Sequence, residues 1–346
     1  MLPKKKLIEL KEELDNCNNP LFIYDKDSDG LCSFLLFYKY KKAGHGMVLS
    51  TRTFDEGFLR KVKSYEPDKI FFLDIPVVPE EFIQDLKIPA VHVDHHLGQE
   101  KIPGLKRFNP RDFNKKDDTC TSSLCYGTVK ENLWIAASGT VSDWQLNSIT
   151  KKFSKEFPKF LSSKIKNPGE AMFKSKIGKV GSVLNLILKG RTENVNESVK
   201  HLVKINSPEE ILEEKTEDAK EVMKRYNKVN LAYRDVLAEA EKFITKDKLF
   251  VFIYHGTRHD EGEMSFTGEL SNELLYKYPK KVLIIAREKN EDMKCSLRSG
   301  SVEIRTKLIE AMKGLEGHGG GHDKACGALI KKKDFEYFIE KFRELL

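Results

Sequence analysis

The chain has 346 residues, 40% of them hydrophobic, and a formal net charge of +7 at pH 7. A chain of this length and composition is expected to form about two globular domains, which excludes a disordered or fibrous protein. No apolar stretch reaches the roughly 18 residues that cross a membrane, and Met1 to Lys6 lack the apolar core of a signal peptide. We therefore expect a soluble protein without membrane partners. The basic excess favours an anionic partner only mildly, because abundant lysine and glutamate also accompany life at high temperature.

Six cysteines are scattered along the chain without a Cys-x-x-Cys pair or a spacing typical of secreted domains. This pattern predicts reduced thiols and a cytoplasmic location. The cysteines are Cys17, Cys32, Cys120, Cys125, Cys295 and Cys326.

Taken in chain order, the sequence starts with a short amphipathic helix over 6–14 and then alternates between strands and helices. We predict strands over 20–24, 47–50, 69–74 and 89–94, and helices over 30–43, 55–65 and 79–87. This alternation is typical of a mostly parallel, doubly wound α/β sheet. Loop signals dominate from Gly98 to Thr119. Thr121 to Ser123 then open a helix whose amides favour ordinary capping over the binding of a phosphate.

The second half of the chain has a different pattern. Residues 147–205 are rich in lysine and predict several short helices, and a long helix follows from the capping signal at Ser207 to about Ile244. Its apolar stripe favours packing on its own protein over a coiled-coil partner. We predict further strands over 248–254, 281–286 and 293–297 and helices over 270–278 and 302–313. The glycine-rich segment 317–322 is expected to be a loop, because each glycine in a helix forfeits about 1 kcal/mol.

Acidic side chains follow three of the predicted strands. Asp25, Asp27 and Asp29 follow the first strand and would lie on one side of an extended chain, Asp74 ends the third, and Asp94-His95-His96 follows the fourth. Parallel strands bring their carboxyl ends to one edge of a sheet, where oxygen and imidazole ligands suit a divalent metal. Asp143 is a further candidate ligand. An EF-hand loop is excluded because its twelfth position, Leu36, is not Glu, and a solvated acidic turn does not explain three such strand ends.

These motifs resemble the DHH phosphoesterase superfamily, and the Asp-x-Asp-x-Asp-Gly form of the first is similar to its RecJ-type nucleases. A second signature near the C-terminus resembles the DHHA1 domain that follows DHH in RecJ-type exonucleases and smaller oligoribonucleases. It consists of Cys295-Ser296-Leu297-Arg298-Ser299, Gly319-Gly320-Gly321-His322 and Ala325-Cys326-Gly327-Ala328. The resemblance implies a DHH catalytic domain over 1–150, a helical region with a long connecting helix over 151–246, and a smaller α/β DHHA1 domain over 247–346, with a cleft between the two domains.

The resemblance also implies two divalent ions, Mn²⁺ or alternatively Mg²⁺, which a carboxylate-rich ligand set prefers over zinc. Asp27 and Asp29 would each hold one ion, Asp74 would bridge both, and His95 and Asp143 would complete the second ion's shell. His96 would face the scissile phosphate, and Asp94 would orient a neighbouring imidazole. One residue departs from the family pattern: many relatives have a metal-binding His where this chain has Ile23. Either Asp25 supplies the missing ligand or one metal binds more weakly.

The DHHA1-like segment would bind nucleotides through a glycine-rich backbone and cationic side chains. Its implied substrate-binding residues are Ser296, Arg298, Ser299, Gly319, Gly320, Gly321 and His322. For the glycine-rich segment taken alone, a plain tight turn is the structural alternative.

The implied function is a metal-dependent, RecJ-like exonuclease that hydrolyses single-stranded DNA or RNA from one end, with a role in DNA repair and with replication or repair proteins as possible partners. The compact length favours an alternative, a phosphodiesterase for short oligoribonucleotides, cyclic dinucleotides or nucleotide phosphates. A second alternative is a replication-fork binding protein with little or no activity, whose mark would be decayed metal ligands.

Overall fold

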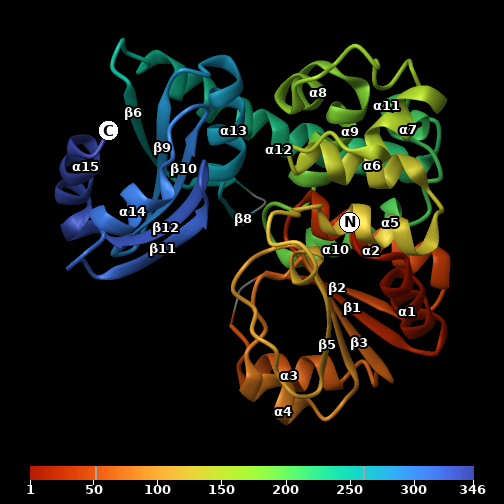
Figure 1. Cartoon of the computed structure of the whole chain (residues 1–346). Helices are drawn as coiled ribbons and strands as arrows, with labels where there is room; N and C mark the ends of the chain where they lie inside the picture. The colour runs from red at the N-terminus through yellow and green to blue at the C-terminus, as the bar shows by residue number, and fades with distance from the viewer. Residues whose placement is uncertain (51–52, 260–261) are drawn as a thin grey trace. The chain divides into compact units, whose positions relative to one another are not determined.

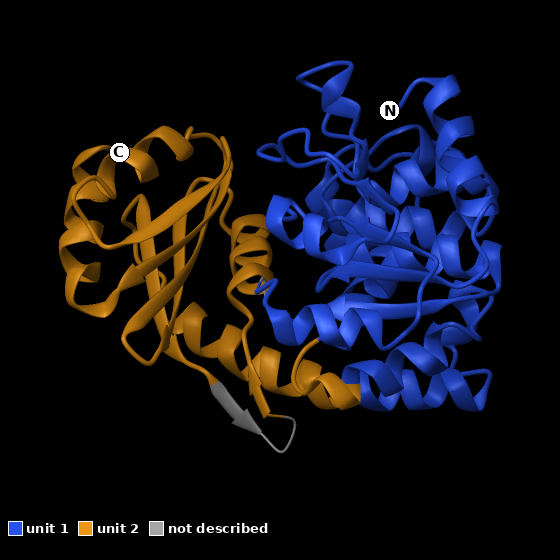
Figure 2. Cartoon of the chain, turned by 90° about the horizontal axis from the view of Figure 1, so that it is seen from below, with its two compact units in different colours: residues 1–188, 195–226 blue, residues 189–194, 227–346 orange. Residues whose placement is uncertain are grey.

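The computed structural model describes residues 1–50, 53–259 and 262–346 (Figure 1). The chain divides into two compact units, which Figure 2 colours separately. Unit 1 comprises Met1–Leu188 and Val195–Tyr226, and unit 2 comprises Lys189–Asn194 and Asn227–Leu346. Among the described residues, no helix combines the length and the apolar character needed to span a membrane.

Unit 1 is built on a five-stranded sheet in which every neighbouring pair of strands is parallel. Its strands are β1 (Pro20–Asp25), β2 (His45–Leu49), β3 (Lys69–Leu73), β4 (Ala90–Val93) and β5 (Leu105–Phe108), in the order β2-β1-β3-β4-β5. The predicted parallel α/β sheet is therefore confirmed. The prediction missed β5, because Lys106 and Arg107 interrupt its apolar signal; an edge strand tolerates such charges.

Helices cover both faces of this sheet (Figure 1). The helices in this part of the chain are α1 (Lys4–Asp15), α2 (Ser28–Lys41), α3 (Glu56–Lys63), α4 (Glu80–Leu86), the short η1 (Pro110–Asp112), α5 (Thr121–Val129) and α6 (Leu133–Ser142), of which α6 packs on α2 and α5. Alternate residues of a strand point to opposite faces. Phe22 of β1 and Phe71 of β3 accordingly pack on Phe37 of α2, whereas Ile23 and its neighbours form a core cluster with α3 and α4. Burial on both faces is why these strands read as continuous apolar runs.

The middle of the chain is helical. Its helices are α7 (Ser148–Glu156), α8 (Pro168–Lys174), α9 (Lys176–Leu186), α10 (Thr192–Leu202), α11 (Pro208–Leu212) and α12 (Glu217–Lys242). The long helix α12 begins in unit 1 and lies mostly in unit 2. The helix start at Ser207 is real, since its hydroxyl accepts the Glu210 amide at 3.2 Å. One continuous helix from there was wrong, however, because Glu214 has φ +49° and separates α11 from α12. The apolar stripe of α12 is buried in the protein itself.

Unit 2 contains a second five-stranded sheet, with the order β11-β12-β10-β9-β6. Its strands are β6 (Leu249–His255), β9 (Val282–Lys289), β10 (Asp292–Ser299), β11 (Gly317–His322) and β12 (Ala325–Lys331); β7 (Thr257–His259) and β8 (Gly262–Met264) form a small separate hairpin. Its helices are α13 (Thr267–Lys277), α14 (Arg305–Ala311), η2 (Lys332–Asp334) and α15 (Phe335–Glu344). Only β6 and β9 pair in parallel, and α14 and α15 cover one face through an apolar core. The second α/β domain is thus confirmed.

The glycine-rich segment Gly317–His322 is an edge strand, which corrects the predicted loop. Some of its glycines are needed because β11 lies close to its neighbours, whereas a Cβ on Gly320 would have nothing within 4 Å. Gly321 has φ +136°, and a Cβ there would lie 2.5 Å from the carbonyl oxygen of Ala325; a Cβ on Gly319 would lie 2.7 Å from Met312 Sδ. The prediction considered only helix propensity, whereas pairing with β12 supplies the hydrogen bonds that hold this segment extended.

Candidate metal centre

The first acidic motif spans the turn from β1 into α2. Asp25 ends β1, Asp27 is the N-cap of α2 and accepts the Gly30 amide at 2.9 Å, and Asp29 lies in the first helical turn. A Cβ on Gly30 would lie 2.6 Å from the Asp25 carbonyl oxygen, so the tight turn requires glycine. The chain does not stay extended over all three carboxylates, because the helix starts at Ser28, so the alternation considered for an extended chain does not apply to Asp29.

Asp29 is buried against the N-terminus of α5. Its carboxylate accepts the amides of Thr121 at 2.7 Å and Ser122 at 3.0 Å, together with the Ser122 hydroxyl. A negative charge is favourable at a helix N-terminus, so these amides serve a carboxylate of the chain itself and not a phosphate. A carboxylate offers about four lone-pair positions, and these three bonds leave one for a metal.

Asp74 is held immediately beyond β3 with its side chain 1% exposed. Its amide donates to Val93 O at 2.9 Å, and its Oδ1 accepts the Thr121 hydroxyl at 2.9 Å. The backbone has φ +63°, a conformation that Asp tolerates better than most residues. Burial, and then the charges of Asp29 and Asp27, raise the pKa of Asp74 well above its usual value. A divalent cation would remove this penalty.

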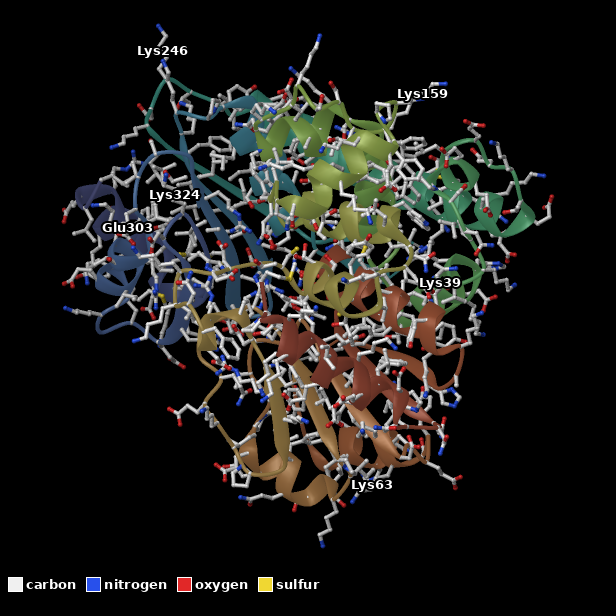
Figure 3. All side chains as sticks on the ribbon, turned by 45° about the vertical axis from the view of Figure 1, so that its right-hand side comes forward. Lys39, Lys63, Lys159, Lys246, Glu303 and Lys324 are labelled. Atoms are coloured by element: carbon white, nitrogen blue, oxygen red, sulfur yellow. The ribbon has the colours of Figure 1, made fainter. Side chains whose placement is uncertain are left out.

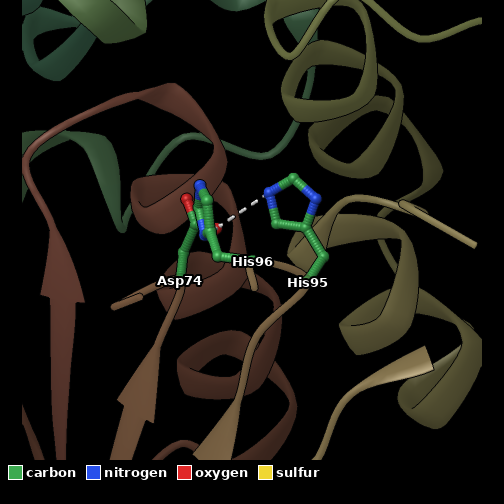
Figure 4. A group of neighbouring side chains, drawn as sticks. All are labelled: Asp74, His95 and His96. Carbon is green, nitrogen blue, oxygen red and sulfur yellow. Dashed lines mark ion pairs between the residues drawn. The ribbon is translucent and has the colours of Figure 1, made fainter. Parts of the chain in front are cut away.

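His95 presents one ring nitrogen to two carboxylates. Its Nδ1 lies 2.9 Å from the carbonyl oxygen of Asp118, which can only accept, so Nδ1 carries the hydrogen and Nε2 bears the lone pair of the neutral ring. Nε2 lies 3.5 Å from Asp74 Oδ1 and 4.0 Å from Asp143 Oδ2. Figure 4 shows the ring pointing toward Asp74. This is the tautomer that a metal-binding histidine requires.

Asp94 and His96 form a hydrogen-bonded pair. The fully buried Asp94 accepts the His96 amide through Oδ2 and the His96 ring Nδ1 through Oδ1, both at 2.8 Å. Burial acts to raise the pKa of Asp94, but the hydrogen bond and charge of His96 outweigh it and lower the value to about 2. Asp94 is therefore a carboxylate at neutral pH, and His96 Nδ1 carries the hydrogen of this bond.

Asp143 is positioned by the end of a helix and not by a strand. It is the C-cap of α6, and the two amides that follow close a Schellman motif: Trp144 N donates to Val141 O at 3.1 Å and Gln145 N to Thr140 O at 3.0 Å. The Gln145 side chain then donates to Asp143 Oδ2 at 2.9 Å and to Asp118 O at 2.7 Å. Burial, followed by the charges of Asp29 and Asp27, raises the pKa of Asp143 well above its usual value.

Among the described residues, two groups of side chains have ligand atoms within 4.8 Å of one another: Asp74 with His95 and His96, and Asp29 with Cys120 and Asp143. Cys120 is a poor ligand here. Burial, then Asp29 and Asp143, raise the pKa of its thiol well above the usual value, and its Sγ lies within hydrogen-bonding distance of the Ser123 hydroxyl. The remaining oxygen and imidazole donors fit a hard divalent cation.

Asp25 and Asp27 belong to neither group, although the negative charges of both act on the carboxylate of Asp74. Burial, then the charges of Asp25 and Asp29, raise the pKa of Asp27 to about 6. The fully buried Ile23 lies in the core cluster with α3 and α4. The metal-ligand assignments of Asp25, Asp27, Asp29, Asp74, His95 and Asp143, and the roles of Asp94 and His96, stay predictions.

Several residues that sequence reasoning missed hold the site together. Thr121 bonds to Asp74 across 47 positions of the chain, and Gln145 bonds to Asp143. The buried Asn109 donates to His96 O at 2.9 Å, and Arg111 Nε donates to His95 O at 2.7 Å. Asn109-Pro110 marked only a loop in the sequence, and nothing local indicated that its side chain supports the histidine pair.

In unit 2, the predicted substrate residues of β10 divide between the two faces of the sheet. Arg298 is anchored from Nε to Asn272 Oδ1 at 2.9 Å and from Nη1 to Leu297 O at 2.9 Å. Ser296 shares its face and lies 2.9 Å from the Ser271 hydroxyl. Ser299 points to the opposite face, where its hydroxyl accepts the Val302 amide at 2.9 Å.

The strand register places the other predicted substrate residues. Arg298 pairs with Ala325, which pairs with His322, and Ser296 pairs with Gly327, which pairs with Gly320. Because directly paired residues share a face, His322 and Gly320 lie on the same face as Arg298 and Ser296. Gly319 and Gly321 lie on the opposite face, which α14 and α15 cover.

Comparison with models of protein families identifies two known domains in the chain. The model of the DHH family, N-terminal domain, matches residues 21–153, and that of the DHHA1 domain matches residues 247–346. No curated protein matches the sequence significantly.

Solved structures share the fold. A RecJ in complex with Mn²⁺ from Thermus thermophilus has a TM-score of 0.71 at 15% identity, and the match covers 99% of this chain and 55% of that one. An exonuclease RecJ bound to manganese has a TM-score of 0.60 at 15% identity and covers 99% and 94%. The DHH domain of a member of a family of ribosomal proteins has a TM-score of 0.63 at 11% identity and covers 98% and 89%.

The chain thus spans just over half the length of the Thermus protein. Its acidic strand ends, paired histidines and glycine-rich strand lie within the segments that the two family models match. The chain belongs to the DHH family and carries a DHHA1 domain.

Proposed function

We propose that this protein is a metal-dependent phosphodiester hydrolase, and specifically a RecJ-like exonuclease that degrades single-stranded DNA or RNA from one end. The observation that carries the proposal is the convergence of Asp29, Asp74, His95 and Asp143 into two adjoining ligand groups at the carboxyl edge of a parallel sheet. The fold shared with RecJ structures that contain Mn²⁺ or Mg²⁺ supports it.

The donor set suits two divalent ions, with Mn²⁺ favoured and Mg²⁺ as the alternative. Asp29 would hold one ion together with Asp143 and His95, Asp27 would hold the other, and Asp74 would contribute to both. Asp25 would supply the ligand that Ile23 cannot provide. When bound, the ions supply an activated water and neutralise the negative charge that grows on the phosphodiester.

The protein's own groups orient the reaction. Asp94 holds the His96 ring through Nδ1, so that Nε2 faces the scissile phosphate and donates a hydrogen bond to it whenever the ring is protonated. Asn109 and Arg111 fix the backbone of both histidines. Loss of either of these residues is therefore expected to misplace the rings without removing a metal ligand.

The shared face of β10, β11 and β12 is the proposed nucleotide-binding surface of unit 2. Arg298 is positioned by bonds from Nε and Nη1, and its Nη2 carries two further donors suited to a phosphate. His322 and the backbone of Gly320 lie on the same face. Gly319 and Gly321 would shape this strand by allowing its close approach, and Ser296 and Ser299 would hold β10 and the turn after it.

The charge of the helical region supports a strand longer than a few nucleotides. Residues 151–179 contain nine lysines but only two glutamates and no aspartate or arginine. Figure 3 shows Lys159, one of these lysines, extending from the ribbon. Lys39, which lies outside this segment, is instead held against the protein, since its Nζ donates to Val203 O at 2.7 Å. Exposed lysines of this density predict salt-sensitive binding of a polyanion. The six buried cysteines, none of them in a disulfide, support a reducing cytoplasm as the location.

The test is digestion of end-labelled single strands of DNA and RNA, from dinucleotides to long strands, with Mn²⁺ and at two salt concentrations. Stepwise shortening of long strands, abolished by EDTA and by Asp74→Asn, is the expected result. Turnover confined to very short strands would instead indicate an oligoribonuclease. Binding without any metal-dependent cleavage would indicate a replication-fork binding protein and refute the proposal.

A further inference from the structure

Like α2, α4 and α5, the helix that delivers Asp143 ends with a non-glycine residue in the left-handed conformation, and in this helix the residue is aromatic. In the Schellman motif at the end of α6, the residue after the C-cap takes a left-handed conformation, and glycine usually fills this position because it has no Cβ to clash. Here the residue is Trp144, with φ +58°. Bulky residues are rare in this region, and such strain persists where the surrounding structure or function requires it.

The strained residue adjoins the candidate metal ligand. Trp144 follows Asp143 directly and precedes Gln145, whose side chain is bonded to Asp143. The Trp144 side chain remains partly exposed. Its ring meets Phe173 of α8 edge-on, with a centroid distance of 6.2 Å and an interplanar angle of 68°. A T-shaped contact sets the edge of one ring against the face of the other, so Phe173 covers at most one of the two indole faces, and the other face can stack on a flat partner.

The chain's other tryptophan shows what a purely structural indole looks like in the same helix. Trp134, near the start of α6, is 5% exposed, and its Nε1 donates to Asn206 O at 3.1 Å. Trp144 is partly exposed, and it occupies a position where glycine would end the helix with less strain.

We propose that Trp144 is a substrate-contacting residue, on which a base stacks when the adjacent phosphodiester lies at the metal centre. The proposal rests on the proposed function, because it requires a nucleic acid strand as the substrate. Stacking on an aromatic ring accepts every base and would give the site affinity without sequence preference. It would also orient the terminal nucleotide beside Asp143.

The two tryptophans allow a direct test by fluorescence, because they are the only ones in the chain. Trp134→Phe leaves Trp144 as the single indole, and Trp144→Phe leaves the buried Trp134 as the matched control. Each variant is titrated with a single strand, with Ca²⁺ in place of Mn²⁺ to slow cleavage and a gel to confirm that the strand stays intact. An abasic strand of equal length supplies the phosphates without the bases.

We expect the base-bearing strand to quench Trp144 strongly, the abasic strand to bind with little quenching, and Trp134 to stay unchanged. Equal quenching by both strands, or no quenching at saturation, would overturn the proposal. If the wild-type protein neither cleaves nor binds any strand, the proposed function itself is refuted, and this inference with it.

Kinetics provide a second readout. Trp144→Gly should raise KM for a strand about tenfold with little change in kcat, whereas Trp144→Phe, which keeps a stacking surface, should stay within about threefold of wild type. Glycine suits the left-handed position, so Trp144→Gly should keep the end of α6 intact. A Trp144→Gly enzyme with wild-type KM would overturn the proposal.

Discussion

Two buried carboxylates of the candidate metal centre should change the stability of the protein in opposite directions when each is replaced by Asn. Asp94 is lowered in pKa to about 2 by its bond to His96, whereas burial and like charges raise the pKa of Asp74. A carboxylate whose pKa is lowered by folding stabilises the protein at pH values above its pKa in the unfolded chain, near 3.8. This stability is lost as the pH falls through the pKa of the folded state. A raised pKa means that the charged form destabilises the fold at higher pH. Asp94→Asn should therefore destabilise the metal-free protein at pH 8, and Asp74→Asn should stabilise it.

The magnitude for Asp94 follows from its pKa. A pKa shift of roughly two units at about 1.4 kcal/mol each gives a loss of ~2–3 kcal/mol in the free energy of unfolding. The Asn side chain would also place its NH2 group against one of the two N–H donors of His96, the backbone amide or Nδ1–H. For a unit of about 200 residues, ~2–4 °C per kcal/mol predicts a fall in Tm of roughly 4–12 °C. In Asp74→Asn the amide oxygen keeps the bond from the Thr121 hydroxyl, so removal of the charge should raise Tm by a few degrees.

The assay is thermal unfolding followed by tryptophan fluorescence, because both tryptophans lie in unit 1 and report its unfolding. Each protein is measured in EDTA and then with Mn²⁺. A ligand at 100 times its Kd stabilises by about 2.7 kcal/mol, so wild type should gain several degrees with Mn²⁺ and Asp74→Asn should gain almost none. If Asp74→Asn lowers Tm in EDTA as Asp94→Asn does, the cluster is not strained by like charges, and the reasoning is wrong.

Three further predictions concern other parts of the molecule. Because the pKa of Asp27 is raised to about 6 and a ligating carboxylate must be ionised, Mn²⁺ affinity measured by calorimetry should fall steadily below pH 6; a flat profile from pH 5 to 7 would contradict this role. Gly321→Ala should destabilise unit 2 by ~1–3 kcal/mol, since its φ is +136° and its Cβ would meet Ala325 O, whereas Gly320→Ala, with nothing within 4 Å of its Cβ, should not; limited proteolysis of both variants tests the difference. All six thiols are buried, so a thiol reagent should label the folded protein far more slowly than the unfolded one. Rapid labelling in the folded state would show that the interior of one unit or of both opens to solvent.

Much of the candidate metal centre could be predicted from the sequence because its signals are local. Strands buried on both faces read as apolar runs, and each is followed by charged residues with no place in a core, as at Asp74 and at Asp94-His95-His96. The parallel arrangement follows from the helices between the strands. Together these features predicted a mostly parallel sheet with one acidic edge, and the strands of this sheet are parallel; their order came only from the structure.

Predictions from local propensity were wrong where tertiary contacts determine the secondary structure. Glycine-rich 317–322 has no strand propensity, yet it forms an edge strand because β12 pairs with it and because glycine at 317 and 321 allows the close approach of the two backbones. The charged β5 is a strand because β4 offers it a free edge. The long helix predicted from Ser207 divides at Glu214, since the local start signal belongs to the short α11.

The sequence alone shows which residue types can bind a metal and that most of them follow predicted strands. Their protonation and orientation depend on contacts that form only in the folded protein. The Thr121 amide that stabilises the Asp29 carboxylate comes from 92 positions away, and the Asp118 carbonyl selects the tautomer of His95. The buried pair with His96 makes Asp94 a permanent carboxylate, while burial and like charges hold Asp74 toward its neutral form. Protonation depends on distance, burial and hydrogen bonds between remote segments, and these exist only once the chain has folded.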